Sequence, residues 1–171
     1  MAFAIIVLIC GAAALLTGGS INNLKNIRFR HSWLVLAAVI IKLVTNSGFR
    51  HTLGLPDPLA PKLYMVSLAL VAVFVLLNLH LRGLALVGLG LLSNLLVIYA
   101  NSGYMPLKRE YFEMIATPEE LELINQGLPA YNYIATGPDT AFYYLSDIFL
   151  KPHWIFITRV FSIGDVLITI G

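Results

Sequence analysis

The side chains best able to do chemistry lie in two matching phrases of the sequence. The phrase "LVTNSGF" ends one apolar run at Asn46, and "IYANSGY" ends another at Asn101, 55 residues later. Lys42 lies one helical turn before Asn46, and Tyr104 closes the second phrase. An ammonium group, two amides and a phenol at neighbouring helix ends can hydrogen-bond the polar head of a lipid, quinone or other small amphiphile. We therefore predict a ligand or partner contact at Lys42, Asn46, Asn101 and Tyr104.

The same phrases also have a structural interpretation. Gly48 and Gly103 can take the left-handed conformation that ends a helix, and the asparagines can bond its last carbonyl groups. Lys42 lies close enough to a helix end to extend its ammonium group to the membrane surface. It could instead pair with an outer carboxylate such as Asp147, or bind an anionic lipid head group. The sequence leaves these alternatives open.

The remaining reactive residues form no catalytic or metal-binding pattern. The histidines are not spaced as two ligands on one helix, although His51 and His153 could both approach an outer carboxylate. The single cysteine, Cys10, excludes an intrachain disulfide. The sequence has no nucleophile elbow, phosphate-binding loop or paired-cysteine motif. We therefore expect no enzyme activity, no bound metal and no cofactor.

The composition indicates the class of protein. Hydrophobic residues make up 58% of the 171 residues, and the mean hydropathy is +0.82. A water-soluble domain of this size cannot bury so many apolar side chains, so we predict an integral membrane protein. Residues 1–100 carry a net charge of +6 and residues 101–171 a net charge of −4. This separation predicts a basic membrane half and an acidic polar half, and nucleic acid is not an expected partner of either.

Four apolar stretches could cross the membrane as helices, at residues 2–17, 33–45, 61–79 and 84–100. A crossing helix needs about 20 residues, and about 17 at minimum. The third and fourth stretches meet this requirement. The first must extend into Gly18 and Gly19, and the second must begin within the basic stretch before Trp33. With these two extensions of the first and second stretches, we predict four transmembrane helices.

A shift of 55 residues aligns the two halves of this region and superimposes Asn46 on Asn101. Residues 1–48 and 56–103 are therefore predicted to form two similar helical hairpins within a bundle of residues 1–103. An even number of crossings in each copy would make the two hairpins parallel.

The basic loop of the first hairpin predicts the orientation of the bundle. Its Lys25, Arg28 and Arg30 would bind lipid head groups. Short loops rich in lysine and arginine stay in the cytoplasm. The N-terminus and residues 104–151 are therefore predicted to be extracytoplasmic.

Polar and small residues of the apolar stretches are expected to join helices rather than to form a path for a solute. Asn94 and Asn101 share one face of the fourth helix. Gly83, Gly88 and Gly90 would permit the close approach of a neighbouring helix.

Residues 104–151 are predicted to form a polar, tyrosine-rich amphipathic cap. Thr117, Pro118 and Glu120 are typical of a capped helix start, and Gly127 of its end. Six of the eight tyrosines lie beyond residue 100. Their rings and hydroxyls suit lipid head groups, or alternatively a protein or sugar partner.

Residues 152–171 are predicted to form an interfacial segment and a C-terminal membrane helix that begins at Ser162, with Asp165 completing the cap. Nine residues after Ser162 rise only about 14 Å, less than half of the hydrocarbon depth. The tail therefore stays at the interface, packs on a partner, or belongs to a longer chain.

Three phrases carry a resemblance to a known family: "LTGGSINNLKNIRFRHSWL", "NLLVIYANSGYMP" and "FSIGDVLITIG". In these the chain resembles a bacterial membrane family known as domain of unknown function 5317. The resemblance implies an integral membrane protein of bacterial type over most of the chain. It implies no activity.

These observations combine into one expectation for the fold and two for the function. The fold is an all-α membrane protein: four transmembrane helices as two hairpins, an extracytoplasmic amphipathic cap, and a C-terminal helix partly or fully embedded in the membrane. The first functional hypothesis is a non-enzymatic accessory or structural subunit of an assembly in the bacterial cytoplasmic membrane, with lipids and other membrane subunits as partners. The alternative is a lipid-, quinone- or small-amphiphile-binding protein with a pocket at the outer ends of the second and fourth helices. A transporter ranks below both.

Overall fold

The computed structural model describes residues 16, 18, 20, 27–46, 52–54, 56, 59–130, 132–150 and 160–171. Most of these residues are helical. The described helices are α3 (Trp33–Asn46), α5 (Leu59–Leu77), α6 (Leu84–Ala100), α7 (Arg109–Ile115), α8 (Pro118–Asn125), α9 (Ile163–Ile170) and the short 3₁₀ helix η1 (Tyr143–Leu145). The described strands are β1 (Met105–Leu107), β2 (Tyr133–Ala135), β3 (Phe149–Leu150) and β4 (Val160–Phe161).

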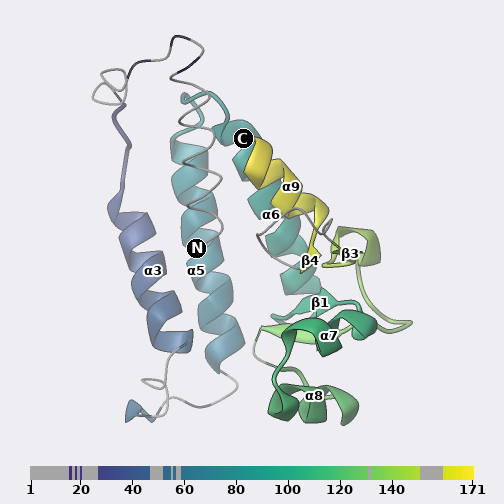
Figure 1. Ribbon diagram of the computed structural model, residues 1–171. Coiled ribbons are helices and arrows are strands. Elements are labelled where there is room, and N and C mark those ends of the chain that lie inside the picture. Colours follow the sequence, from purple (N-terminus) through teal and green to yellow (C-terminus); the bar gives the residue numbers. More distant parts are fainter. Residues whose placement is uncertain are drawn as a thin grey trace.

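The apolar helices lie side by side in one layer. α3 packs on α5, α5 packs on α6, and α6 packs on α9, so that α5 separates α3 from α6 (Figure 1). Large aliphatic side chains of all three long helices stay exposed, including Leu36 at 63%, Val66 at 48% and Leu89 at 58%. Such a surface suits a membrane or a partner and not water.

The helix lengths decide how much of the membrane prediction the structure supports. α5, with 19 residues, is the one helix within the described ranges that is both long and apolar enough to cross a membrane. α6 is equally apolar with 17 residues, and α3 has 14. At 1.5 Å per residue these two helices rise about 26 Å and 21 Å, against a hydrocarbon core of about 30 Å. Residues 2–15, in the first predicted helix, lie outside the described part of the chain.

The expectation that the second membrane helix begins within the basic stretch is wrong. α3 begins at Trp33, and His31 just before it has a left-handed φ of 55°. The Arg30 amide donates to Asn78 Oδ1 at 2.7 Å, and Asn78 Nδ2 donates to the Arg30 carbonyl at 2.9 Å. These two bonds occupy the backbone groups of Arg30 that a longer helix would require.

The two ends of the helix layer differ in charge. The arginines Arg28, Arg30 and Arg82 are exposed near the C-terminal end of α5, which we call the basic end. α7 and α8 lie at the opposite end, near the C-terminus of α6, which we call the cap end (Figure 1). The exposed glutamates of α7 and α8 make the cap end acidic.

The cap contains short strands, so the all-α expectation is wrong there. β1 pairs in parallel with β2, with Met105 opposite Tyr133, and β3 pairs antiparallel with β4. Leu107 of β1, Phe112 of α7 and Ile124 of α8 pack into one buried cluster. Strands of two or three residues are too short to show the alternating pattern that reveals a strand in a sequence.

The predicted helix start in the cap is confirmed. The Thr117 hydroxyl accepts a bond from the Glu120 amide, and Glu120 Oε2 accepts one from the Thr117 amide at 2.8 Å. Pro118 occupies the first turn of α8, and Gly127 follows the helix with a φ of 75°. The buried Ile124 joins α8 to the cap core.

The C-terminal helix α9 runs back along α6 toward the basic end (Figure 1). The capping box of Ser162 and Asp165 is confirmed. Gly164 and Gly90 meet so closely that a Cβ on Gly164 would lie 2.8 Å from the Gly90 carbonyl oxygen. The last residue, Gly171, reaches Gly83 at the start of α6. α9 therefore packs on its own chain along the basic-end half of α6.

Candidate functional site

The four residues of the predicted contact site have different surroundings. Lys42 is exposed on α3, and its Nζ lies 5.8 Å from the centre of the Tyr64 ring of α5. Asn101 and Tyr104 follow α6, a helix that packs on α5 and is separated from α3 by it (Figure 1). The side chain of Asn46 lies outside the described part. Lys42 thus contacts the Tyr64 ring of α5 and not Asp147, and it lies on a different helix from the one that Asn101 follows.

Asn101 joins the helix layer to the cap. Its Nδ2 donates to the Val97 carbonyl at 2.7 Å and to the Ala141 carbonyl at 3.0 Å, and its Oδ1 accepts from the Ala141 amide at 3.1 Å. The chain then turns through Ser102 and Gly103, whose φ values are 60° and 92°. The helix-stop interpretation is therefore confirmed at Asn101. The amide also holds the loop before η1, and this was not apparent from the sequence.

The predicted head-group residues lie at the basic end. Arg28 and Arg30 are exposed, and Lys25 lies outside the described residues. Phe29 between them packs against Phe74 of α5, with ring centres 5.8 Å apart. The backbone of this segment is thus fixed to α5 while both guanidinium groups remain accessible, which is suitable for binding lipid phosphates.

An apolar groove lies between the cap-end halves of α5 and α6. Its volume is about 740 Å³, and its lining residues are Lys62, Met65, Val66, Ala69, Leu92, Leu95, Leu96 and Tyr99. Lys62 and Tyr99 are both exposed, and each lies within one helical turn of the cap end of its helix. The groove therefore has aliphatic walls with one ammonium group and one phenol at its outer end.

Hydrogen bonds between polar side chains join α9 to α6. Asn94 Nδ2 donates to Asp165 Oδ1 at 2.9 Å, and Asn94 Oδ1 accepts from the Ser162 hydroxyl at 3.0 Å. Asp165 Oδ2 also accepts from the Ser162 amide at 3.0 Å. The Asp165 carboxylate is thus hydrogen-bonded within the chain. The predicted role of Asn94 in joining helices is confirmed.

Asp147 is a buried carboxyl group next to this junction. Its exposed fraction is 7%, and Oδ1 has no hydrogen-bond partner in the part of the chain that the structure describes. Burial, together with the smaller effect of the negative charge of Asp165, raises the pKa of Asp147 to about 7. Asp147 is therefore partly protonated at neutral pH.

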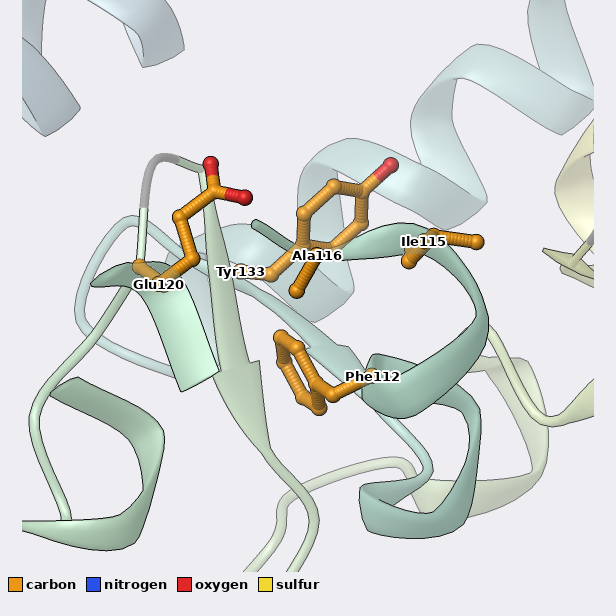
Figure 2. Close-up of a pocket in the computed structure, with 6 residues that line it drawn as sticks. Phe112, Ile115, Ala116, Glu120 and Tyr133 are labelled. Atoms are coloured by element: carbon orange, nitrogen blue, oxygen red, sulfur yellow. The ribbon is translucent and has the colours of Figure 1, made fainter. Parts of the chain in front are cut away.

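A second, smaller cavity lies in the cap between α7, α8 and β2. Its volume is about 150 Å³, and its lining residues are Phe112, Ile115, Ala116, Glu120, Ala130 and Tyr133. The Phe112 and Tyr133 rings lie between Glu120 on one side and Ile115 on the other (Figure 2). Across the described ranges, no three histidine, cysteine, aspartate or glutamate side chains are grouped as metal ligands.

A family model described as "Family of unknown function (DUF5317)" matches residues 26–171. The chain belongs to this family. The match extends over every element from α3 to α9 and includes Arg28 and Arg30, so the resemblance seen in the three phrases is confirmed. No curated protein and no solved structure matches the chain.

Sequence reasoning did not find the groove or the cap cavity. Lys62 was visible only as a charge at the start of the third apolar stretch, and Tyr99 only as part of the fourth. The lining residues of the cavity come from three segments, at residues 112–116, at Glu120 and at residues 130–133, and no local spacing connects these segments. The one available signal was Glu120, which the capping box had already explained.

Proposed function

We propose that the protein is a non-enzymatic accessory or structural subunit of an assembly in the bacterial cytoplasmic membrane. The groove between α5 and α6 carries the proposal, because it is a concave apolar surface that no described segment fills. We propose that an apolar helix of a partner subunit occupies it.

The chemistry of the groove supports a helix as its occupant. Lipid chains are as apolar as the groove, so association inside a membrane depends on close packing and small residues. Ala69 lies among the lining residues, with Leu92 and Leu96 opposite on α6. A small residue between larger aliphatic ones lets a second helix approach closely.

The charge distribution supports a multi-pass topology. The exposed Arg28, Arg30 and Arg82 at the basic end favour a cytoplasmic position for that end, and the acidic cap end is then extracytoplasmic. We propose that α3, α5 and α6 are membrane helices and that residues 2–17 form a fourth. The short α3 would require local thinning of the bilayer or contact with a partner.

A second candidate, an amphiphile-binding protein, is favoured by Lys62 and Tyr99. An acyl or isoprenoid chain would lie along the groove, and its anionic or carbonyl head would meet the Lys62 ammonium group and the Tyr99 hydroxyl. This places the amphiphile between α5 and α6 and away from Lys42.

Gentle extraction from the native membrane followed by intact mass spectrometry tests both candidates. A stoichiometric partner subunit is expected under the first, and a monomer with a co-extracted amphiphile under the second. Ala69→Phe, which fills the groove, should abolish either form of retention. Lys62→Met should release an amphiphile but keep a partner helix.

Leu36→Phe is the matched control, because it enlarges an exposed side chain of α3 outside the groove. It should leave retention unchanged. Recovery of the bare monomer from wild-type membranes, with neither partner nor amphiphile, would refute both candidates.

A further inference from the structure

The cap cavity is lined by aromatic rings and a carboxylate, and packing against a partner helix requires no such cavity. Phe112 and Ala130 are each 2% exposed and form its buried side, while Ile115 is 40% exposed and Glu120 is half-buried at its rim. The cavity is therefore closed by apolar groups at one side and reaches solvent beside a carboxylate.

Two aromatic rings supply the walls. The Phe112 and Tyr133 rings meet edge to face, with centres 6.5 Å apart and planes at 85° (Figure 2). The face of an aromatic ring carries negative potential and attracts organic cations. Rings held nearly at right angles can present such potential to one ligand from two directions.

The charge around the cavity is predominantly negative. Glu120 is the only charged residue among those that line it. Its Oε2 accepts a hydrogen bond from the Thr117 amide, which fixes the carboxylate at the rim of the cavity. Residues 109–126 contain five glutamates and one arginine, a net charge of −4. This segment repels anions and attracts cations.

We propose that the cap cavity binds an alkylated ammonium group, with the Phe112 and Tyr133 rings against its methyl groups and Glu120 against its charge. A primary ammonium ion would lose strong hydration in such apolar surroundings, whereas a quaternary ammonium group is weakly hydrated. The volume is sufficient, because an apolar cavity of about 150 Å³ can hold a benzene-sized ligand. The ammonium group belongs either to a free small molecule or to a lipid head group.

Choline is the probe for this site, and 3,3-dimethylbutan-1-ol is its neutral counterpart of nearly the same shape. Binding is measured by ligand-observed NMR on the full chain in nanodiscs of phosphatidylglycerol. We expect saturable choline binding that is about ten-fold tighter than that of the neutral alcohol. Equal binding of the two ligands would overturn the proposal.

Glu120→Gln removes the charge and keeps a side chain that can still complete the capping box. It should weaken choline binding about ten-fold and leave the neutral alcohol unaffected. Glu119→Gln is the matched control, because Glu119 is exposed, adjacent and outside the cavity. Equal choline affinity in the wild type and the Glu120 variant would refute the assignment.

Ala116→Leu should exclude both ligands by filling the cavity. Adding phosphatidylcholine to the nanodiscs then identifies the source of the ammonium group. If phosphatidylcholine competes with free choline, and if the Glu120 variant shows no such competition, the ammonium group belongs to a lipid head group. Choline binding that phosphatidylcholine leaves unchanged indicates a free small molecule.

Discussion

Three asparagines use their amide groups to connect segments that are distant in the sequence. Asn78 binds the backbone of Arg30, Asn94 binds Ser162 and Asp165, and Asn101 binds the backbone of Ala141. In an apolar environment an unpaired amide is costly, so each of these residues is placed where both its donor and its acceptor are satisfied. The polar residues of the apolar helices therefore hold the fold together.

Replacing Asn101 with Leu should release the cap from α6. The variant leaves the Ala141 amide and carbonyl without partners, at a cost of about 1–3 kcal/mol for each group that is not rehydrated. We expect faster proteolysis within residues 104–150 in detergent, with α5 and α6 still protected. Gln126→Ala, at an exposed position of the cap, should match the wild type. Unchanged proteolysis of the Asn101 variant would contradict this role.

The burial of Asp147 should make stability depend on pH. The pKa of Asp147 is about 7 in the folded chain, against an ordinary value of 3.8. Between these values the unfolded chain binds fewer protons, so the free energy of unfolding falls as pH rises, and the loss is complete above about pH 7. Three pKa units correspond to at most about 4 kcal/mol.

Asp147→Asn tests this because it removes the ionisable proton at nearly constant shape. The variant should be more stable than the wild type at pH 8, and the difference should disappear near pH 4. Thermal unfolding in detergent at several pH values measures it. Asp139→Asn, at an exposed site, should show no such pH-dependent gain. Parallel pH profiles for all three proteins would contradict the buried state of Asp147.

At the scale of elements, the sequence predicted features that depend on local signals and missed features that depend on distant contacts. α6 has the predicted bounds, and α8 has the predicted cap, because hydropathy and capping residues act within a few positions. α3 is shorter than expected because Asn78, 48 residues away, binds the backbone before it. The pairing of β1 with β2 likewise depends on segments that lie 28 residues apart.

The contact of α9 with α6 depends on two glycines. A Cβ at Gly164 would overlap Asn94 Oδ1 and lie 2.8 Å from the Gly90 carbonyl oxygen. Gly164→Ala should therefore displace α9 and destabilise the fold by about 1–3 kcal/mol. Thermal unfolding measures the loss. Gly137→Ala, which meets nothing within 4 Å, is the control. Equal stability of the two variants would show that α9 does not pack as described.

At the scale of the whole molecule, the single layer of helices leaves apolar side chains on its surface. An exposed apolar surface of this kind is typical of contact with lipid or with a partner. The arginines at the basic end and the glutamates at the cap end then predict one orientation across the bilayer.

Cysteine labelling tests this orientation. In a Cys10→Ser background, a cysteine replacing Glu122 should react with a membrane-impermeant maleimide on intact spheroplasts. A cysteine replacing Arg82 should react only after the membrane is permeabilised. Both original residues are exposed, so a lack of reaction reports the membrane side and not burial. The reverse pattern would invert the topology and place the cap in the cytoplasm.

The sequence alone determined the apolar character of the chain, the bounds of α6, the capping of α8 and α9, and the family. Each of these depends on composition or on residues a few positions apart. Only the tertiary structure decided that α5 separates α3 from α6, that Asn94 holds α9, and that two aromatic rings and Glu120 line a cavity. These features depend on which distant segments pack together, and hydropathy is the same for every arrangement of the same helices.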